Sequence, residues 1–381
     1  MQKIQEILDS LPNYEKTGSV PDFEAGLMRV KRVLKALGDP QDKYPIIHIV
    51  GSKGKGSTVR LIEQGLVQMG YKVGSYYSPH IYRLNERIRL GGMEIPDSEL
   101  EGVVARVYEI PEAREITYFE FLTVCMFLYF ADKGVDYAVV EAGMGGRLDA
   151  TNCAREPKCV VLTRVELEHA EILGDTIEKI VAEKLGVMRG GAKLFKYNFN
   201  NNWGKPLGLK GDHQRKNAYL AWEVLRFINP KKVGGVDFAN VSLPGRFERR
   251  VWLGREAIFD MAHTVDSAVS LRETLDREFP GRKFLFIMSF LKDKNAAGII
   301  EALKKEVDLV WLYPLQHERA IGREELEKLR KVVERVEELP DGFVPVVCGS
   351  GYLVSALGAR KAWLTGLDSP PGDGSQPFLN V

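Results

Sequence analysis

Short apolar runs alternate with longer stretches of helical periodicity along the first half of this chain. Runs at residues 44–50, 137–142 and 159–163 are strand-like, and helical patterns occupy residues 57–69 and 176–188. Parallel α/β units produce this alternation, because a crossover helix must separate each buried strand from the next parallel one. The pattern therefore predicts a parallel sheet with flanking helices.

A second series of the same kind begins after Pro244 and Gly245. Its predicted strands are residues 257–261, 283–290, 309–313 and 344–347, and its best-defined predicted helices are residues 323–338 and 352–359. Two α/β domains, residues 1–243 and 244–366, are the simplest partition. Residues 193–211 are rich in Asn, Gly and Lys and are predicted to be a loop-rich connection. Residues 367–381 are predicted to be a flexible tail, since their Pro, Gly and Ser content cannot support a packed core.

Composition narrows the class of protein. A chain of 381 residues with 45% hydrophobic and 28% charged residues is typical of a globular protein of two or three domains. With a net charge of +1, the molecule as a whole has no positive electrostatic field that would attract nucleic acid or anionic membranes. The four cysteines form no CxxC pair, which argues against a zinc or disulfide framework and favours a reducing cytoplasm. The longest uncharged apolar run, residues 121–131, is about half of a membrane span, so no signal peptide or transmembrane helix is predicted.

The strongest local motif is the glycine-rich segment GSKGKGS at residues 51–57. It follows a strand-like run and opens a helical pattern that ends at Gly70. Glycines let backbone N–H groups turn toward an anion, a helix N-terminus adds a favourable dipole, Lys55 supplies a cation and Ser57 can ligate magnesium. The strict phosphate-loop pattern fails, because Gly56 follows Lys55 and Ile49 stands where its first glycine is required. Nucleotide binding is the predicted role, and a flexible basic turn is the alternative.

A second candidate is Glu141, at the end of a predicted strand and beside the glycine-rich segment 142–147. Ligands of open α/β sheets bind at the carboxyl ends of the strands. A carboxylate there can hold a magnesium ion that bridges nucleotide phosphates. The alternative is an ordinary solvated loop residue.

A third candidate is Lys184, which shares the apolar face of a predicted helix that starts near Thr176. The other members of that face are Ile177, Ile180, Val181 and Met188. An inward lysine usually pairs with an acid or extends its ammonium group to water. The alternative is a lysine modified or deprotonated for a role beside His169 and Glu141.

Together these segments resemble the folylpolyglutamate synthase/dihydrofolate synthase family, within the Mur ligase superfamily of ATP-dependent amide-bond ligases. The resemblance runs from about residue 27 to residue 357. Its anchors are GSKGKGS (51–57), YSPH (77–80), ERI (86–88), TYFE (117–120), EAGMGGRLDATN (141–152), LGDT (173–176), GDHQ (211–214) with Asn217, PGRFE (244–248), DMAH (260–263) and GSGYLV (349–354). An ordered series across two domains is much harder to obtain by chance than one glycine loop.

The resemblance implies a role for each matching position. The implied ATP-binding residues are Gly54, Lys55, Gly56, Ser57, Asn217, Arg246 and Asp260. The implied ligands of two magnesium ions are Ser57, Ser78, Glu141 and His169. The implied substrate-binding residues are Thr117, Tyr118, Phe119, Glu120, Leu148, Asp149 and Ala150 for a pterin-bearing substrate, with His263 and Ser350 for glutamate. Lys184 matches the carbamylated lysine of the family, and the implied catalytic group is Lys55, Lys184, His169 and Glu141.

The implied fold is α/β, with an N-terminal P-loop ATPase-like parallel sheet flanked by helices and a smaller C-terminal Rossmann-like domain. Residues 1–243 would bind ATP and residues 244–366 would form the glutamate ligase domain. The implied activity is addition of L-glutamate to reduced folates through an acyl phosphate, with dihydropteroate as an open second acceptor. The expected partners are small molecules, without nucleic acid or membrane, and the expected protein is a cytoplasmic monomer.

Several positions depart from the family pattern. Lys53 stands where Asn is usual, Glu168 where Asp is usual, Leu185 where Ala is usual and Thr264 where Asn is usual. The segment 184–246 also looks shorter than is usual. These departures keep two alternatives open, a Mur-type ligase with a non-folate acceptor and a non-catalytic nucleotide-binding homologue. A regulatory or transport-type ATPase is a further alternative, but it leaves the match at 260–263 unexplained.

Overall fold

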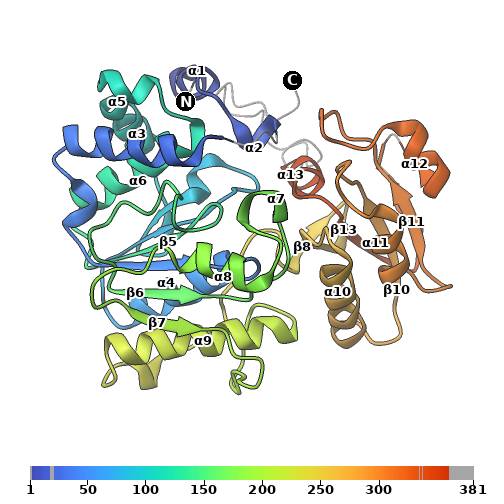
Figure 1. Cartoon of the computed structure of the whole chain (residues 1–381). Coiled ribbons are helices and arrows are strands. Elements are labelled where there is room, and N and C mark those ends of the chain that lie inside the picture. Colours follow the sequence, from blue (N-terminus) through green and yellow to red (C-terminus); the bar gives the residue numbers. More distant parts are fainter. Residues whose placement is uncertain (1, 18–20, 334, 337, 360–381) are drawn as a thin grey trace. The chain divides into compact units, whose positions relative to one another are not determined.

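The computed structural model describes residues 2–17, 21–333, 335, 336 and 338–359 (Figure 1). The chain divides into two compact units. The first comprises Met1–Gly208 with His213–Val241, and the second comprises Leu209–Asp212 with Ser242–Val381. The predicted flexible tail at 367–381 lies outside the described residues.

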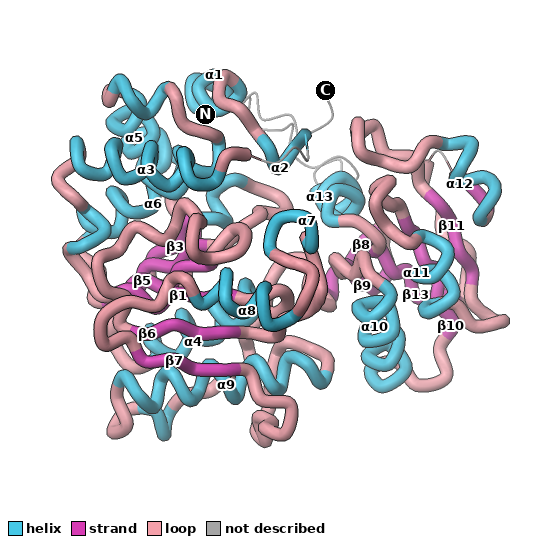
Figure 2. Tube along the Cα trace, in the orientation of Figure 1, coloured by secondary structure: helices cyan, strands magenta, loops and turns pink. Residues whose placement is uncertain are grey.

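The first unit is built on a seven-stranded sheet with the strand order β4-β3-β2-β5-β1-β6-β7 (Figure 2). Its strands are β1 (Ile46–Val50), β2 (Val73–Tyr76), β3 (Ile88–Leu90), β4 (Met93–Glu94), β5 (Tyr137–Glu141), β6 (Cys159–Leu162) and β7 (Lys193–Lys196). Strands β2, β5, β1, β6 and β7 run parallel, whereas β3 and β4 form an antiparallel edge. The predicted parallel α/β architecture is confirmed, and the antiparallel edge is an addition to it.

Strand β7 contradicts the prediction that residues 193–211 form only loops. Its sequence, Lys-Leu-Phe-Lys, is exposed at both ends and has no fully buried residue. Leu194 pairs with Val160 of β6 in parallel register. The strand forms because a buried neighbour offers unpaired backbone groups, which four residues of local sequence do not reveal.

Helices surround this sheet. They are α1 (Gln2–Asp9), α2 (Tyr14–Thr17), α3 (Phe23–Ala36), α4 (Lys55–Gln68), α5 (Asp97–Tyr108), α6 (Tyr118–Lys133), α7 (Ala170–Leu173), α8 (Ile177–Leu185) and α9 (Asp212–Ile228), with short 3-10 turns η1 (Pro40–Asp42), η2 (Leu84–Arg87), η3 (Pro111–Arg114) and η4 (Val233–Gly235). Helix α4 packs against β1, β2 and β5, while α3 and α5 pack against α6. This arrangement covers the central strands with helices.

Helix α6 contains the apolar run noted in the sequence. Residues 120–130 are all buried in it, which is the expected state of a helix that is apolar on every side. Thr117 begins the helix by accepting the backbone N–H of Glu120. Gly134 ends it in the left-handed conformation, with a φ of 58°. In the part of the chain that the structure describes, no helix is long and apolar enough to cross a membrane.

The second unit contains a six-stranded sheet with the order β12-β11-β10-β13-β9-β8. Its strands are β8 (Glu248–Trp252), β9 (Arg255–Phe259), β10 (Lys283–Met288), β11 (Leu309–Leu312), β12 (Lys331–Val332) and β13 (Phe343–Cys348), and its helices are α10 (Val265–Glu278), α11 (Ala296–Leu303), α12 (Arg323–Leu329) and α13 (Gly351–Ala359). All neighbours are parallel except β8 and β9. This smaller α/β unit confirms the predicted second fold.

The helix predicted at 323–338 is wrong beyond Leu329. Arg330 has extended backbone angles, and Lys331 then pairs with Trp311 at the edge of the sheet. The charged sequence here has helical periodicity, but pairing with β11 decides its conformation.

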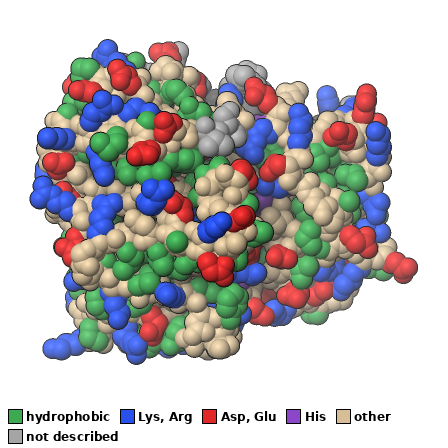
Figure 3. All heavy atoms as spheres, in the orientation of Figure 1, with side chains coloured by type: hydrophobic (Ala, Val, Ile, Leu, Met, Phe, Trp, Pro, Cys, Tyr) green, Lys and Arg blue, Asp and Glu red, His purple; other side chains and the backbone are tan. Residues whose placement is uncertain are grey.

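On the visible face of the molecule, acidic and basic side chains are interspersed, in keeping with a net charge near zero (Figure 3).

Candidate active site

The glycine-rich segment joins β1 to α4, so the predicted sequence of strand, glycine turn and helix is confirmed. Gly51 has a φ of 148°, and a Cβ there would lie 1.9 Å from the hydroxyl oxygen of Thr163. Gly54 is the N-cap of α4 with a φ of 89°, and a Cβ there would lie 2.8 Å from the side-chain oxygen of Asn217. Both positions therefore need glycine for backbone angle and for space.

The N-terminus of α4 supplies the anion-binding part of this segment. The N–H groups of Lys55, Gly56 and Ser57 lie in the first turn, where no carbonyl one turn earlier in the helix can accept them. In contrast, the N–H groups of Ser52 and Lys53 donate to the carbonyl of Arg164, at 2.9 and 3.0 Å. The donors suited to a phosphate therefore come from the helix start, where the dipole also favours a negative charge.

Two lysines converge on one carbonyl oxygen of this turn. The Nζ atoms of Lys55 and Lys184 lie 3.2 and 2.9 Å from the carbonyl oxygen of Gly51. Lys184 is 2% exposed, and its Nζ lies 3.6 Å from Oε1 of Glu168. The predicted inward orientation of Lys184 is thus confirmed, together with the acidic partner that an inward lysine needs.

Burial, together with the positive charge of Lys55, lowers the pKa of Lys184 to about 8, although the carboxylate of Glu168 opposes both effects. Burial alone would raise the pKa of Glu168. The hydrogen bond from Ser52 and the charge of Lys184 outweigh it, and the pKa is lowered. This pocket therefore holds an ionised carboxylate beside a lysine that loses its proton unusually easily.

The rest of the predicted apolar face of this helix is only partly buried. Ile180 is fully buried, but Ile177 is 40% exposed because it stands at the first position of α8. Helix α8 ends at Leu185, so Met188 lies beyond it. The predicted helix 176–188 is therefore about one turn too long at its C-terminal end.

Glu141 is the last residue of β5 and is buried, with an exposed fraction of 5%. Its neighbour in register on β1 is Ile49, which precedes the glycine turn by two residues. The backbone N–H of Ser78, in the loop after β2, donates to Oε2 of Glu141 at 3.4 Å. The parallel strands β2, β5 and β1 thus bring Ser78, Glu141 and the glycine turn to one edge of the sheet, and the predicted place of Glu141 at a strand end is confirmed.

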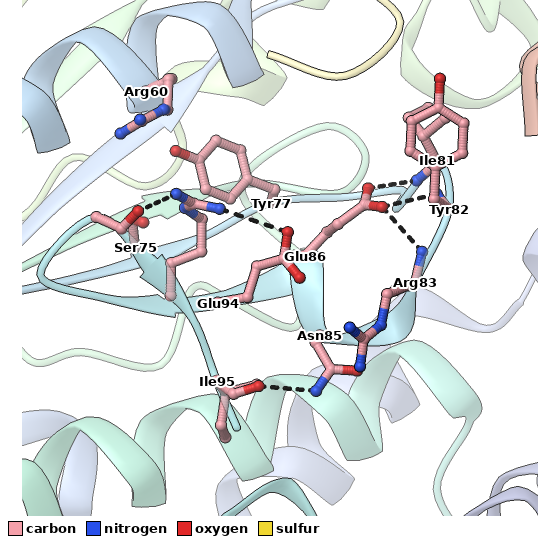
Figure 4. Close-up of polar contacts among 12 residues, drawn as sticks. Arg60, Ser75, Tyr77, Ile81, Tyr82, Arg83, Asn85, Glu86, Glu94 and Ile95 are labelled. Carbon is pink, nitrogen blue, oxygen red and sulfur yellow. Dashed lines mark hydrogen bonds and ion pairs between the residues drawn. The ribbon is translucent and has the colours of Figure 1, made fainter. Parts of the chain in front are cut away.

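The loop that carries Ser78 is held by a neighbouring carboxylate. Glu86 accepts the backbone N–H groups of Ile81, Tyr82 and Arg83 at 2.7, 2.7 and 2.8 Å (Figure 4). Burial raises the pKa of Glu86, although these three donors oppose that effect. One carboxylate thereby fixes the path of the loop that follows Ser78.

His169, which the family resemblance implies as a magnesium ligand, lies on the surface of the first unit. It is the exposed N-cap of the short helix α7, with a φ of 50°. Among the described residues, its imidazole forms no hydrogen bond. Its place among the metal ligands stays a prediction.

A chain of amide hydrogen bonds connects Ser57 with Asn217. The side-chain Nε2 of Gln214 donates to the Ser57 hydroxyl at 3.1 Å, and Nδ2 of Asn217 donates to Oε1 of Gln214 at 3.1 Å. All three side chains are buried. Gln214 was not among the predicted site residues. Its position three residues before Asn217, on the same side of α9, is the sequence signal that points to it.

The predicted substrate segment 117–120 forms the start of α6. Thr117 and Glu120 cap the helix reciprocally, and Glu120 also pairs with Arg29 at 3.0 Å. Tyr118 is buried, whereas Phe119 is only partly buried. Thr117 and Glu120, at the two ends of the segment, are therefore bonded within the protein. The ring of Phe119 is the side chain of this segment that stays partly exposed.

The second predicted substrate segment, 148–150, meets the first at Gly143. A Cβ on Gly143 would lie 2.6 Å from the Phe119 ring and 3.2 Å from Oδ2 of Asp149. Asp149 is buried and accepts the N–H groups of Met144 and Thr151 at 2.8 and 2.9 Å. Burial raises its pKa. Asp149 therefore fixes the conformation of this loop. On either side of Asp149 in the sequence, Leu148 is half-buried and Ala150 is buried.

In the second unit, Asp260 and Ser350 follow the paired parallel strands β9 and β13. The carboxylate of Asp260 accepts the N–H groups of Phe247 and Ala262 at 2.7 and 2.8 Å, and burial raises its pKa. The N–H of Gly349 donates to the carbonyl of Ala262 at 2.8 Å. These bonds hold the segment 260–263 beside the loop that contains Ser350.

His263 and Ser350 each form a local hydrogen bond with the segment in which they stand. The Nδ1 atom of His263 lies 2.8 Å from the carbonyl oxygen of Met261, so this nitrogen carries the proton. Ser350 is buried, and its hydroxyl oxygen accepts the N–H of Tyr352 at 3.2 Å. Arg246 is partly buried and donates to the carbonyl of Gly245 at 3.1 Å. Thr264, the departure next to His263, is the N-cap of α10.

Comparison with family models assigns both halves of the chain. Residues 49–210 match the Mur ligase middle domain, and residues 245–359 match the Mur ligase glutamate ligase domain. The two matches contain every predicted site residue except Asn217.

Individual relatives agree with these models. The chain is 29% identical to the dihydrofolate synthase/folylpolyglutamate synthase of Bacillus subtilis, over 88% of this chain and 92% of the relative. It is 30% identical to the Escherichia coli protein of the same name, over 80% and 81%. Mycobacterium tuberculosis folylpolyglutamate synthase, solved with ADP and AMPPCP, superposes with a TM-score of 0.78 at 26% identity, over 95% of this chain and 97% of that one. The chain therefore belongs to the folylpolyglutamate synthase/dihydrofolate synthase family of Mur ligases.

Proposed function

We propose that this chain is an ATP-dependent ligase that adds L-glutamate to reduced folates through an acyl phosphate. The observation that carries the proposal is the pair of lysines, Lys55 and Lys184, on the Gly51 carbonyl at the start of α4. Relatives support the substrates: a bifunctional folylpolyglutamate synthase/dihydrofolate synthase was solved with Mn, AMPPNP and L-glutamate, and an E. coli relative with DHPP and ADP.

The reaction has two steps. A carboxylate oxygen of the folate attacks the γ-phosphorus of ATP, the bond to the bridging oxygen breaks, and ADP leaves. The amine of glutamate then attacks the acyl carbon, phosphate leaves with its electron pair, and the nitrogen loses a proton. Lys55 and the N–H groups of the first turn of α4 stabilise the charge that develops on the transferred phosphoryl group.

The donor set of this chain fits magnesium. The buried carboxylate of Glu141 and the hydroxyl of Ser57 are hard oxygen donors, which Mg²⁺ prefers. Within the described ranges, no cluster of three or more His, Cys, Asp or Glu side chains forms a complete protein cage. Mg²⁺ bound mainly through nucleotide phosphates needs only such a partial set, and would neutralise phosphate charge there. We propose two magnesium ions, with Ser57, Ser78, Glu141 and His169 as their protein ligands.

Carbamylation of Lys184 is part of the same proposal. A neutral Nζ attacks the carbon of CO₂, a C–N bond forms, one C=O electron pair moves to oxygen, and water takes the proton lost by nitrogen. A pKa of about 8 supports this step, because a usable fraction of the amine is then neutral near pH 7. The Nζ atom lies 3.6 Å from Oε1 of Glu168, so a carbamate formed on this nitrogen would repel that carboxylate. The modification therefore requires a cation between the two groups.

The remaining site assignments follow the two units separately. In the first unit, the apolar surface for the pterin-bearing substrate comes from Phe119, Leu148 and Ala150. The segments that carry this surface are held in place by Thr117, Tyr118, Glu120 and Asp149. In the second, His263 and Ser350 receive glutamate. Arg246 and Asp260 are the residues of the second unit assigned to ATP, and Asn217 is the residue of the first unit assigned to the base. We propose that the ligase acts as a monomer on small molecules.

An acceptor panel tests the proposed function. Purified protein with MgATP and L-glutamate is offered dihydropteroate, dihydrofolate and tetrahydrofolate separately, and ADP release is measured together with product mass. We expect glutamylated products from the reduced folates. A further product from dihydropteroate would show that both reactions occur.

The alternatives give different results in the same panel. Acceptor-independent ADP release would identify an ATPase, whereas release only with another carboxylate and amine would identify a Mur-type ligase of different specificity. Binding of ATP without any turnover would identify a non-catalytic homologue. Each of these three outcomes contradicts the proposed function.

Replacement of Gly54 by Ala is expected to weaken MgADP binding about tenfold, because the new Cβ would meet the Asn217 amide beside the phosphate-binding turn. Gly70→Ala is the matched control. Gly70 has a similar φ of 84°, but nothing lies within 4 Å of its added Cβ. Both variants carry the same backbone strain, so calorimetric MgADP affinities that fall equally in both would refute a specific role for Gly54.

A further inference from the structure

Helix α4 carries a buried carboxylate to which the ligase reaction assigns no role. Glu63 is fully buried, and its Oε1 accepts hydrogen bonds from the Ser75 hydroxyl at 2.7 Å and from Nε of Arg89 at 3.3 Å. Its Oε2 accepts from Nη1 of Arg60 at 2.7 Å and from the Tyr77 hydroxyl at 2.9 Å. Arg60, Ser75 and Tyr77 can be followed in Figure 4. Each oxygen of this carboxylate thus has two donors.

The four donors come from separate segments of the first unit. Arg60 stands on α4 itself, whereas Ser75 on β2 and Arg89 on β3 are partners in antiparallel register. Tyr77 follows the last residue of β2. Burial raises the pKa of Tyr77 well above its ordinary value, and the charge of Glu63 acts in the same direction, so the hydroxyl keeps its proton and donates. Glu63 therefore fastens α4 to β2, to β3 and to the residue just after β2.

This cluster lies between two segments of the candidate active site. On α4, Ser57 stands less than two helical turns before Glu63. Beyond β2, Tyr77 is followed directly by Ser78, whose N–H donates to Oε2 of Glu141 at 3.4 Å. The hydrogen bond between Tyr77 and Glu63 therefore connects the helix that begins at the glycine turn with the loop that carries Ser78.

Stability alone does not account for an ionic cluster at this place. The side chains of Arg60 and Arg89 are only 15% and 16% exposed, and that of Glu63 is not exposed. Withdrawal of charged groups from water is costly, and apolar side chains of similar volume often stabilise a buried contact as well or better. What the cluster adds is direction, because charge-assisted hydrogen bonds fix distances and angles. A loop that carries a metal ligand needs such precision.

We propose that Glu63 is a positioning residue for the magnesium site, and that it acts through Tyr77 on Ser78. Its carboxylate holds the Tyr77 hydroxyl and thereby keeps Ser78 in place relative to Glu141 and to the first turn of α4, without touching the metal. The inference rests on the proposed function, which assigns Ser78 and Glu141 to magnesium.

The affinity for ADP with and without magnesium tests this role. Calorimetric titration of the full chain gives the dissociation constant of ADP in EDTA and in excess Mg²⁺, and the ratio of the two measures what the metal contributes. Tyr77→Phe removes one hydroxyl and keeps the ring. We expect this variant to lower the ratio about tenfold and to leave the affinity in EDTA unchanged, because only the metal ligand is misplaced. The Mg²⁺ concentration for half-maximal turnover should rise about tenfold, with kcat at saturating Mg²⁺ close to that of the unaltered chain.

Two matched variants separate positioning from stability. Ser75→Ala removes a hydroxyl from the same carboxylate, but the backbone of Ser75 is held by β3 and β5 on either side. This variant should lower the free energy of unfolding to a similar extent as Tyr77→Phe and leave the magnesium ratio unchanged. Tyr76→Phe removes the neighbouring hydroxyl, which lies 3.3 Å from the Thr123 hydroxyl on the opposite face of the sheet. It should also leave the ratio unchanged.

Glu63→Gln tests the carboxylate itself, because it replaces an acceptor oxygen by a donor that faces two other donors. The variant should lower the magnesium ratio at least as much as Tyr77→Phe. Thermal unfolding shows whether it is folded, and if it is not, Tyr77→Phe decides.

The outcomes distinguish this inference from the proposed function. An unchanged ratio in Tyr77→Phe, or an equal loss in Ser75→Ala, would overturn the positioning role and leave the ligase proposal standing. Absence of any magnesium contribution to ADP affinity in the unaltered chain would overturn the magnesium assignment together with the positioning role.

Discussion

Replacement of Lys55 by Ala is expected to lower ATP-dependent turnover by about 10²- to 10³-fold, with little change in the folded structure. The lysine is the first residue of α4, and its Nζ lies 3.2 Å from the Gly51 carbonyl. From there it reaches an anion held by the N–H groups of the same turn. Removal of this cation costs the transition state more than the ground state, because charge on the transferred phosphoryl oxygens develops during the reaction. Initial rates with saturating MgATP and glutamate measure the effect.

The matched control is Lys53→Ala, two residues earlier in the same turn. The backbone of Lys53 is held by the Arg164 carbonyl in a β-bridge, outside the first turn of α4. We expect this variant to raise the KM for ATP modestly and to leave kcat close to that of the unaltered chain. If Lys55→Ala and Lys53→Ala lose the same activity, the glycine turn acts only through its overall charge, and the assignment of Lys55 is wrong.

Replacement of Lys184 by Ala is expected to lower turnover about 100-fold or more while sparing the fold. In a carbamylated site, this variant loses a carboxylate-like ligand. Added acetate or formate should then restore part of the activity, because a small carboxylate fits the space that the side chain leaves. Lys184→Met fills that space and should not be rescued. A ¹³C resonance from ¹³CO₂-treated protein that is absent in both variants would identify the carbamate directly.

The contrary result for Lys184 is equally well defined. If its role is only to pair with Glu168, no carboxylate restores Lys184→Ala, and no carbamate resonance appears. Unchanged turnover in Lys184→Ala would remove the residue from the catalytic group altogether. In either case Lys55 and the glycine turn remain testable on their own.

The pH dependence of Lys184 has a definite sign. Its pKa is lowered from 10.5 to about 8 by burial and by Lys55, so the neutral amine becomes abundant as the pH rises through about 8. At constant dissolved CO₂, carbamylation should therefore increase from pH 7 to pH 9. Between the two pKa values the unfolded chain holds the extra proton, and the free energy of unfolding rises with pH there. Lys184→Met should lack this rise, which denaturant titrations at several pH values would show.

Local sequence was sufficient for the central strands and for the glycine turn. β1, β5 and β6 are short apolar runs, four or five residues long and rich in Val and Ile, which is typical of buried parallel strands, and the glycines before α4 mark a turn whose backbone angles favour glycine. The inward position of Lys184 also followed from helical spacing, because residues three and four apart share a face regardless of what lies opposite.

Neighbouring elements overrode local preference elsewhere. Residues 331 and 332 have helical periodicity with the preceding charged segment, yet they pair with β11, and the polar residues 193–196 join β6. An edge strand gains its stability from the backbone groups of its neighbour, so its own side chains carry little information about it. The end of α8 before Met188 is a similar error of extension.

The sequence by itself determined which residues this chain has for phosphate chemistry, and the elements on which they stand. Only the tertiary structure decided that Lys184 and Lys55 share the Gly51 carbonyl, that Glu168 is the partner of Lys184, and that Gln214 supports Ser57. Periodicity and turn chemistry act over a few residues and can be seen in the sequence. Contacts between residues more than 100 positions apart depend on which strands pair and in what register, and that choice is made by the whole sheet and its core.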